Sequence, residues 1–151
     1  MTIVDSPRVS GPAAYVLVLF CANRRTLRVG ALGELEFQPG YYLYVGSGGA
    51  NVLKRIERHL RPRKIRRWQV DWLTSGPGRL RPAEACILPG LRECAVARSL
   101  GRSLEPAHRL GASDCRCITH LYNSRNAAQV RRVLKDLVRR AGQRVITSRS
   151  V

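Results

Sequence analysis

The stretch richest in reactive side chains runs from Gly40 to Leu60, GYYLYVGSGGANVLKRIERHL. It predicts a strand, a glycine-rich turn and a helix starting near Ala50 or Asn51, because aromatic and branched residues give way to glycines and then to a helical apolar pattern. On that helix Arg55 and His59 lie four residues apart and share one edge. A cation and an imidazole therefore face the mouth of the turn. The strand and turn side chains expected there are Tyr42, Tyr44 and Ser47.

A strongly basic loop follows this helix. Pro62 ends the helix, and the segment RPRKIRR over residues 61–67 has a cation at nearly every position. Beside the edge formed by Arg55 and His59, such a loop can contact a phosphate backbone, although charged runs are by default solvated. The candidate nucleic-acid contacts are Ser47, Lys54, Arg58, Arg61, Arg63, Lys64, Arg66 and Arg67.

A second group of donors occurs in the segment SDCRCITH, which offers two thiols and one imidazole. Zinc requires four such ligands, so Cys94 or His108 would have to complete a site. The spacing C-x-C-x-x-H is not one of the standard zinc spacings. We therefore expect Cys115, Cys117 and His120 to pack near Cys94 as buried groups with reduced thiols and no zinc, and zinc binding is the alternative.

The segment WQVDWL comes directly after the basic loop. It places Trp68, Trp72 and Leu73 on one side of a helix, so we expect the tryptophans to anchor the core rather than to stack on bases. Asp71 lies among them and is a candidate structural partner.

A small α+β fold must position these residues. The run AAYVLVLFCA over residues 13–22 is apolar throughout, as in a strand that is buried on both faces, and it predicts the central strand of a sheet. We predict a small, mostly antiparallel sheet of three or four strands with flanking helices. The other expected strands are at residues 26–30, 34–37, 41–45 and 83–88, and further helices at about 91–100 and after the capping residue Asn126.

The composition indicates one basic globular domain. Of the 151 residues, 44% are hydrophobic and 25% charged, as in an ordinary folded domain. The charges are unbalanced, since 27 Lys and Arg against 10 Asp and Glu give a formal net charge of +17. Such an excess repels itself in the folded state and is typical of proteins that bind a polyanion, most often nucleic acid. A basic ribosomal or chromatin protein would have a similar composition.

The sequence favours a cytoplasmic location and no membrane partner. Residues 1–11 lack the basic and apolar regions of a signal peptide. The longest apolar run, residues 13–22, is shorter than the roughly 20 residues that span a bilayer. Five cysteines are an odd number, so we do not expect disulfides.

Taken together, these motifs resemble the GIY-YIG nuclease superfamily. Its two signature strands correspond to residues 13–15 and 44–46, and the following helix supplies Arg55 and His59. From its position alone, Glu93 is expected to be an ordinary glutamate in the first turn of a helix, where the helix dipole favours a negative charge. In the resemblance, Glu93 corresponds to the glutamate that holds a divalent metal. More narrowly, the chain is similar to a small branch long filed as a domain of unknown function. The segments that match this branch are Gly40–Ser47, Arg55–His59, Trp68–Asp71, Glu93-Cys94 and Ser113–Leu121.

The resemblance covers roughly residues 11–125 and involves five motifs in order. Two positions depart from the pattern: Ala13 replaces a glycine and Gln69 replaces a histidine. Neither change affects the expected catalytic residues. The resemblance therefore implies a competent metal-dependent phosphodiesterase. The expected organisation is a flexible leader at 1–10, a GIY-YIG-like nuclease domain at 11–125, and a basic amphipathic helix and tail at 126–151 packed on the same domain.

Phosphodiester cleavage requires an activated water, positive charge on the phosphate oxygens and a stabilised leaving oxygen. The resemblance implies that Glu93 holds one Mg²⁺ or Mn²⁺ and that Arg55 neutralises charge on the phosphate. Tyr44 or Tyr15, with a phenol pKa lowered by nearby cations, would orient or deprotonate the water. His59 would assist by hydrogen bonding or proton transfer.

The leading hypothesis is thus a divalent-metal-dependent endonuclease that is structure-selective or weakly sequence-specific. DNA is the favoured substrate, but the sequence does not choose DNA over RNA. One alternative is a non-catalytic basic RNA- or DNA-binding module on the same fold. Another is a zinc-stabilised structural component of a nucleoprotein particle. The resemblance does not choose among duplex, branched and single-stranded substrates, and it leaves the oligomeric state open.

Overall fold

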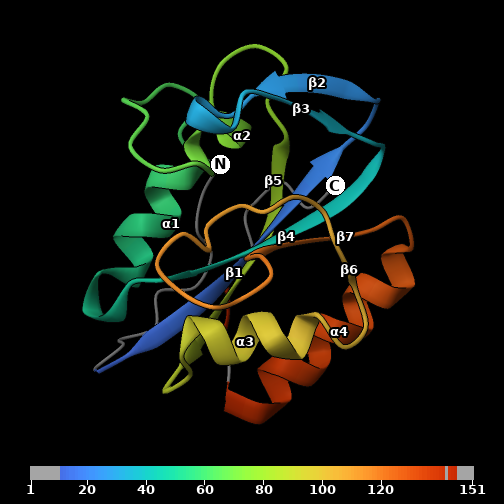
Figure 1. The fold of residues 1–151 in the computed structure, drawn as a ribbon. Coiled ribbons are helices and arrows are strands. Elements are labelled where there is room, and N and C mark those ends of the chain that lie inside the picture. Colours follow the sequence, from blue (N-terminus) through green and yellow to red (C-terminus); the bar gives the residue numbers. More distant parts are fainter. Residues whose placement is uncertain (1–10, 142, 146–151) are drawn as a thin grey trace.

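The computed structural model describes residues 11–141 and 143–145, so the expected leader at 1–10 and the end of the tail lie outside the described residues. At its centre is an antiparallel sheet with six strands among the described residues. The strands are β1 (Ala13–Cys21), β4 (Gly40–Ser47), β5 (Arg81–Pro89), β6 (Glu105–Pro106), β7 (Leu121–Ser124) and β8 (Gln143–Val145). Their order across the sheet is β6-β7-β4-β1-β5-β8 (Figure 1). A separate antiparallel pair joins β2 (Arg25–Arg28) to β3 (Glu34–Phe37).

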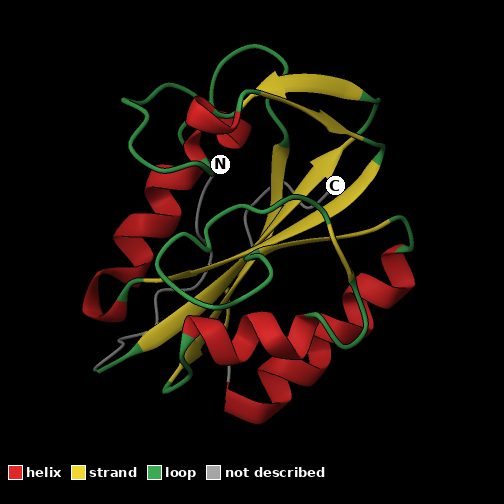
Figure 2. Cartoon of the chain, in the orientation of Figure 1, coloured by secondary structure: helices red, strands yellow, loops and turns green. Residues whose placement is uncertain are grey.

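Helices cover both faces of this sheet (Figure 2). The short 3-10 helices are η1 (Gly30–Leu32) and η2 (Gly49–Asn51), and the α-helices are α1 (Val52–Leu60), α2 (Asp71–Thr74), α3 (Glu93–Leu100) and α4 (Ala127–Ala141). One hydrophobic core joins the sheet to α1, α2 and the β2–β3 pair, and a second core joins it to α3 and α4. The described chain is therefore a layered α+β fold, which confirms the predicted class.

Strand β1 is central, as its continuous apolar sequence predicts. It pairs with β4 on one side and with β5 on the other. Successive side chains of a strand point to opposite faces, so Tyr15 and Leu17 enter the first core while Ala14 and Val16 enter the second. Because both faces are covered, neither set of positions has to be polar.

The prediction of three or four strands is wrong, because the sheet also includes three short strands of two to four residues, β7 and the edge strands β6 and β8. Such short segments cannot display a repeated polar and apolar alternation, and β6 includes Pro106, which suits an edge position. The β2–β3 pair, which local sequence does predict, forms a ladder of its own and does not extend the main sheet.

The tryptophan segment also differs from expectation. It forms only one helical turn, α2, and the Trp68 side chain is 39% exposed, so core anchoring holds for the partly buried Trp72 but not for Trp68. The reason is Asp71, whose Oδ2 accepts hydrogen bonds from the backbone N–H of Arg67 at 2.7 Å and of Trp68 at 2.9 Å. These bonds fix the chain before the helix and hold Trp68 at the surface. Asp71 is thus the structural partner that the sequence predicts.

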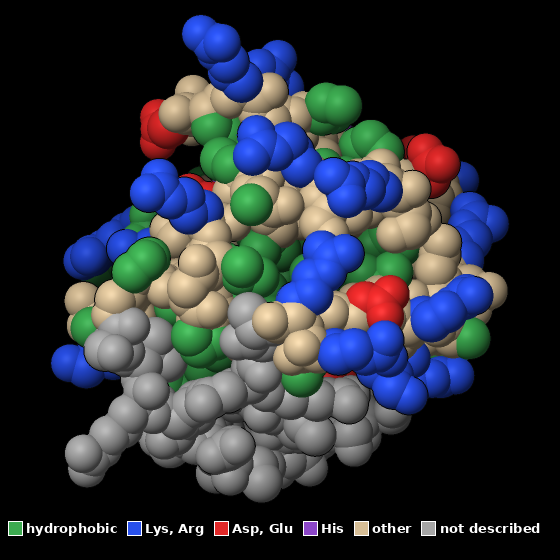
Figure 3. All heavy atoms as spheres, turned by 90° about the horizontal axis from the view of Figure 1, so that it is seen from below, with side chains coloured by type: hydrophobic (Ala, Val, Ile, Leu, Met, Phe, Trp, Pro, Cys, Tyr) green, Lys and Arg blue, Asp and Glu red, His purple; other side chains and the backbone are tan. Residues whose placement is uncertain are grey.

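Helix α4 follows the predicted capping residue. Asn126 Oδ1 accepts hydrogen bonds from the backbone N–H of Ala128 at 2.9 Å and Gln129 at 3.2 Å, which satisfies donors of the first turn. The inner face packs into the second core through Val130, Leu134 and Leu137. Seen from below, the side on which α3 and α4 lie in Figure 1, the molecule shows many Lys and Arg and few Asp and Glu side chains (Figure 3). None of the helices in the described part of the chain is long and apolar enough to span a membrane.

Candidate functional site

The site begins with a close contact between two adjacent strands. Tyr15 of β1 lies opposite Gly46 of β4. A Cβ atom at Gly46 would lie 2.4 Å from Cζ and from the hydroxyl oxygen of Tyr15. The tyrosine ring therefore lies across the glycine, and only glycine leaves room for it. This contact gives a physical reason for the sequence Tyr-Val-Gly at the end of β4.

The hydroxyl group of Tyr15 reaches helix α1, where it lies 2.6 Å from Nε2 of His59. The His59 side chain is fully buried. Burial, with a further contribution from Lys64, lowers the pKa of His59 to about 3, so the imidazole is neutral at physiological pH. Its Nδ1 atom has no hydrogen-bond partner among the described residues. With the proton on Nδ1, the neutral ring presents Nε2 to Tyr15 as an acceptor.

Tyr44 completes an aromatic group around His59. Its ring centroid is 6.3 Å from that of Tyr15 and 6.0 Å from that of His59. The expectation that cations lower the tyrosine pKa values is wrong for this structure. Burial is the largest cause for both residues and raises the pKa of Tyr15 and of Tyr44. The next contribution comes from Tyr44 for Tyr15 and from Glu93 for Tyr44, and the lowering effect of Arg55 is smaller than that of burial in both cases. Both phenols therefore keep their protons in the free protein.

Arg55 borders the same space. One guanidinium N–H donates to the backbone carbonyl of Ser47 at the end of β4, and the guanidinium carbon lies 5.1 Å from the centre of the Trp68 ring. Within the described residues, the side chain makes no other hydrogen bond or ion pair. The remaining N–H groups are thus available to an anion in the pocket.

Glu93 reaches this pocket from the opposite face of the sheet, because it is the first residue of α3. The pocket has a volume of about 320 Å³, and its lining includes Tyr15, Tyr44, Arg55 and Glu93. A neighbouring pocket of about 410 Å³ shares Ser47, Arg55 and Glu93 with it, so the two form one groove. The structure therefore gathers four of the five predicted catalytic residues around one pocket. The fifth, His59, lies behind Tyr15.

The pocket also has donors that suit a hard divalent cation. The carboxylates of Glu93 and Asp114 both belong to its lining. The Glu93 side chain is 37% exposed, and Nδ1 of His120 lies 3.8 Å from its Oε2, which is too long for a hydrogen bond. Mg²⁺ is commonly bound by one or two carboxylates together with water and substrate phosphate. The donor set fits Mg²⁺ or Mn²⁺.

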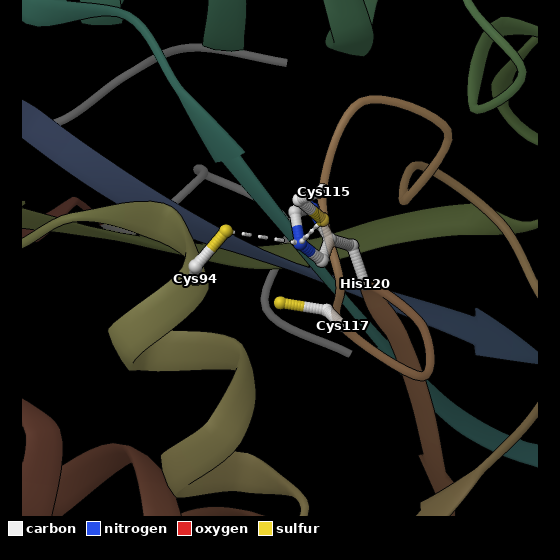
Figure 4. A group of neighbouring side chains, drawn as sticks. All are labelled: Cys94, Cys115, Cys117 and His120. Atoms are coloured by element: carbon white, nitrogen blue, oxygen red, sulfur yellow. Dashed lines mark hydrogen bonds between the residues drawn. The ribbon is translucent and has the colours of Figure 1, made fainter.

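A second group of donors lies beside the start of α3. Cys94 points from α3 toward the loop before β7, which carries Cys115, Cys117 and His120 (Figure 4). His120 Nε2 is 3.4 Å from Sγ of Cys115 and 3.9 Å from Sγ of Cys94. The predicted packing of these residues near Cys94 is confirmed, but the expected burial holds only for His120, because Cys115 and Cys117 are half-buried. His108, the other candidate for a fourth ligand, lies elsewhere, with Nε2 2.7 Å from the backbone carbonyl oxygen of Glu36.

A model of one protein family, described as domain of unknown function DUF123, matches residues 14–143. The chain belongs to the DUF123 family. The match includes the pocket residues Tyr15 and Glu93 as well as the Cys and His group. Neither the comparison with curated proteins nor that with solved structures found a match. The function of this DUF123 chain must therefore be argued from its geometry.

Three of the predicted nucleic-acid contacts of this DUF123 chain have partners within the protein. Arg58 forms a bidentate ion pair with buried Asp71, with N–O distances of 2.6 and 2.7 Å. Lys64 donates to the His59 carbonyl oxygen at 3.0 Å and to the Thr74 hydroxyl at 2.9 Å. Arg66 donates to the Ser75 hydroxyl at 2.9 Å and lies 4.5 Å from the centre of the Trp72 ring. These cations stabilise the loop at 61–70.

The other predicted contacts are open to solvent or to the pocket. Four of the predicted contacts are exposed cations whose side chains have no hydrogen-bond or ion-pair partner among the described residues: Lys54, Arg61, Arg63 and Arg67. Arg67 lines the pocket, as does Ser47. Of the four exposed cations, Arg67 therefore borders the pocket directly.

Sequence reasoning missed three pocket residues of the DUF123 fold. Trp68 lines the pocket and lies beside Arg55 and Arg58; an aromatic residue at the end of a basic run was the available signal. Asp114 also lines the pocket, although it was noticed only as part of a thiol-rich segment. Gln69 Oε1 accepts a hydrogen bond from the backbone N–H of Gly111 at 2.8 Å, which ties the basic loop to the loop before β7. No local pattern indicates that contact.

Proposed function

We propose that this protein is a divalent-metal-dependent endonuclease that hydrolyses phosphodiester bonds in DNA, on a GIY-YIG-like fold. One observation carries the proposal. Tyr15, Arg55 and Glu93 come from β1, α1 and α3 and border one pocket, and Tyr15 is hydrogen-bonded to His59. These are the side chains that phosphodiester hydrolysis requires: a proton relay, a cation for the phosphate and a carboxylate for the metal.

In the proposed reaction, a water attacks phosphorus while its proton passes to the Tyr15 oxygen. The bond from phosphorus to the leaving sugar oxygen breaks, and that oxygen takes up a proton from solvent. The original Tyr15 proton passes along the 2.6 Å hydrogen bond to Nε2 of His59. Neutral His59 can accept this proton, although its low pKa makes transfer unfavourable in the free protein. A bound phosphodiester adds negative charge beside the pair, which raises the proton affinity of His59.

Arg55 and Glu93 act on the phosphate from different sides of the groove. The free N–H groups of Arg55 donate to the non-bridging oxygens and stabilise the charge that develops there. Glu93, with Asp114 in the same lining, would hold the Mg²⁺ or Mn²⁺, which when bound supplies further positive charge to the phosphate. The fixed distance between α1 and α3 would orient the phosphate for attack.

The surface around the groove supports a nucleic-acid substrate. Exposed Arg61 and Arg63 lie beyond the end of α1, and the chain has a formal net charge of +17. Cations of this kind contact phosphates and carry no base information, so cleavage should be weakly sequence-specific or guided by the shape of the substrate. Trp68, 39% exposed beside Arg55, offers a face on which an unpaired base can stack.

The direct test is incubation of the full chain with labelled duplex, flap, junction and single-stranded DNA and with RNA, in Mg²⁺, Mn²⁺ or EDTA. We expect cleavage of at least one DNA substrate that stops in EDTA. Glu93→Gln should abolish cleavage and leave nucleic-acid binding nearly unchanged, because it removes the proposed metal ligand but little of the surface charge. The matched control is Glu57→Gln at an exposed position of α1, which should cleave normally. Tight binding without cleavage of any substrate would indicate a binding module instead.

A further inference from the structure

Four metal-ligating side chains converge outside the catalytic pocket, and the proposed nuclease reaction does not use them. They are Cys94, Cys115, Cys117 and His120, and their ligand atoms all lie within 4.8 Å of one another (Figure 4). We infer that these four residues bind one structural zinc ion. The inference goes beyond the proposed function and does not depend on it.

The donor spacing suits a single tetrahedral ion. A zinc–sulfur distance of about 2.3 Å places the ligand atoms of a tetrahedron roughly 3.7 Å apart. The distances from His120 Nε2, 3.4 Å to Cys115 and 3.9 Å to Cys94, lie on either side of that value. Three thiolates and one imidazole form a ligand set that structural zinc sites use. The sequence prediction of no zinc rested on the spacing C-x-C-x-x-H, which is not a standard zinc spacing, although Cys94 was a candidate fourth ligand; the fold brings Cys94 to the other three.

His120 gives a second, independent indication of a ligand. Its side chain is 1% exposed, and its Nδ1 atom is buried without a hydrogen-bond partner among the described residues. Zinc on Nε2 would fix the proton on Nδ1, which faces Glu93 Oε2 at 3.8 Å. Metal-bound histidines usually donate this second N–H to a carboxylate. A small movement of the exposed Glu93 side chain would complete that hydrogen bond.

The ion would join two parts of the chain that are far apart in the sequence. Cys94 belongs to α3, whereas the other three ligands belong to the loop that leads into β7. That loop contains no helix or long strand, so a metal crosslink would stabilise it more than its own backbone contacts do. Because Cys94 is adjacent to Glu93, the same crosslink would fix the start of α3 at the edge of the pocket.

The test is elemental analysis of the purified full chain together with two matched variants. We expect about one zinc per chain, as the tetrahedral ligand set requires. Cys117→Ser should lose most of the zinc and unfold at a lower temperature. Cys21→Ser is the control, because Cys21 lies at the end of β1 and donates to the Asn23 carbonyl oxygen instead. It should keep its zinc.

A second measurement does not require a folded variant. After removal of the native metal from the wild-type chain, added Co²⁺ should give intense thiolate-to-cobalt charge-transfer bands and the visible bands of tetrahedral cobalt. The inference is overturned by metal-free protein that gives no such bands. Iron in place of zinc, or zinc that is retained in Cys117→Ser, overturns it as well. None of these readouts depends on nuclease activity, so the zinc site and the proposed function can fail separately.

Discussion

Nδ1 of His120 lies 3.8 Å from Oε2 of Glu93, while Nε2 of the same ring faces the thiols of Cys94 and Cys115. One imidazole thus stands between the proposed zinc site and the proposed catalytic carboxylate. We expect His120→Cys to keep zinc, since four thiolates also bind it, but to weaken Mn²⁺ binding about tenfold because Glu93 loses its orienting N–H. Elemental analysis and a Mn²⁺ titration followed by EPR measure the two effects.

The control for this prediction is His108→Cys, which changes a histidine outside the cluster and should alter neither quantity. If His120→Cys retains both zinc and full Mn²⁺ affinity, His120 does not position Glu93.

Tyr15→Phe removes the first group of the proton relay and keeps the ring over Gly46. We expect kcat to fall by about 100-fold or more, the usual contribution of general acid–base catalysis, with nearly unchanged affinity for uncleaved DNA. Single-turnover cleavage and a binding titration separate the two. Circular dichroism reports any folding defect, because His59 Nε2 loses its partner. The control is Tyr41→Phe, which changes a tyrosine that packs on Phe20, away from the pocket, and should be fully active. If Tyr15→Phe is as active as this control, Tyr15 is not part of a proton relay.

Burial of His59 makes stability depend on pH. Its folded pKa is about 3, below the ordinary value of about 6.5 in the unfolded chain. Between these values the unfolded state binds more protons, so the free energy of unfolding falls as pH falls. From about pH 7 to about pH 4.5 we expect His59 alone to remove about 2.5 kcal/mol. Urea unfolding at both pH values gives the free energy of unfolding that the wild type and His59→Gln each lose on acidification. The loss in the wild type minus the loss in His59→Gln is the contribution of His59. Equal losses would mean that His59 is charged or exposed in the folded protein.

Two arginines that look equivalent in the sequence should behave differently. Arg58→Gln leaves the buried carboxylate of Asp71 without its ion pair and should lower the free energy of unfolding by about 3 kcal/mol. Exposed Arg63 has no hydrogen-bond or ion-pair partner within the described part of the chain, so Arg63→Gln should change the free energy of unfolding by less than about 0.5 kcal/mol. If Arg63 contacts a phosphate, its loss should reduce the slope of log affinity against log salt by about 0.9. Urea unfolding measures the two stability changes, and DNA binding at several salt concentrations measures the salt slope. If Arg58→Gln and Arg63→Gln have identical effects on stability, the two arginines do not have the different roles assigned to them.

Local sequence predicts those parts of the fold that local forces determine. The apolar run at 13–22 gives β1, and the side chain of Asn126 gives the start of α4. The partners of buried polar groups could not be predicted in this way. The hydrogen bond from Tyr15 to His59 and the approach of Cys94 to His120 join residues far apart in the chain. The sequence also could not predict the direction of the tyrosine pKa shifts. That direction depends on whether the increase caused by burial exceeds the decrease caused by the charge of Arg55.

The two neighbours of β1 differ greatly in their distance along the chain. Val18 pairs with Leu43 of β4 and Val16 with Cys86 of β5, so the first pairing closes a much shorter loop than the second. Loop closure costs more entropy, and takes longer, as the loop lengthens. A nascent chain can therefore form the β1–β4 hairpin and dock α1, with Tyr15 and His59 in contact, before β5 and α3 have been synthesised. Glu93 and then Asp114 are synthesised later, so the chain can acquire hydrolytic competence only after β5 and α3 have formed.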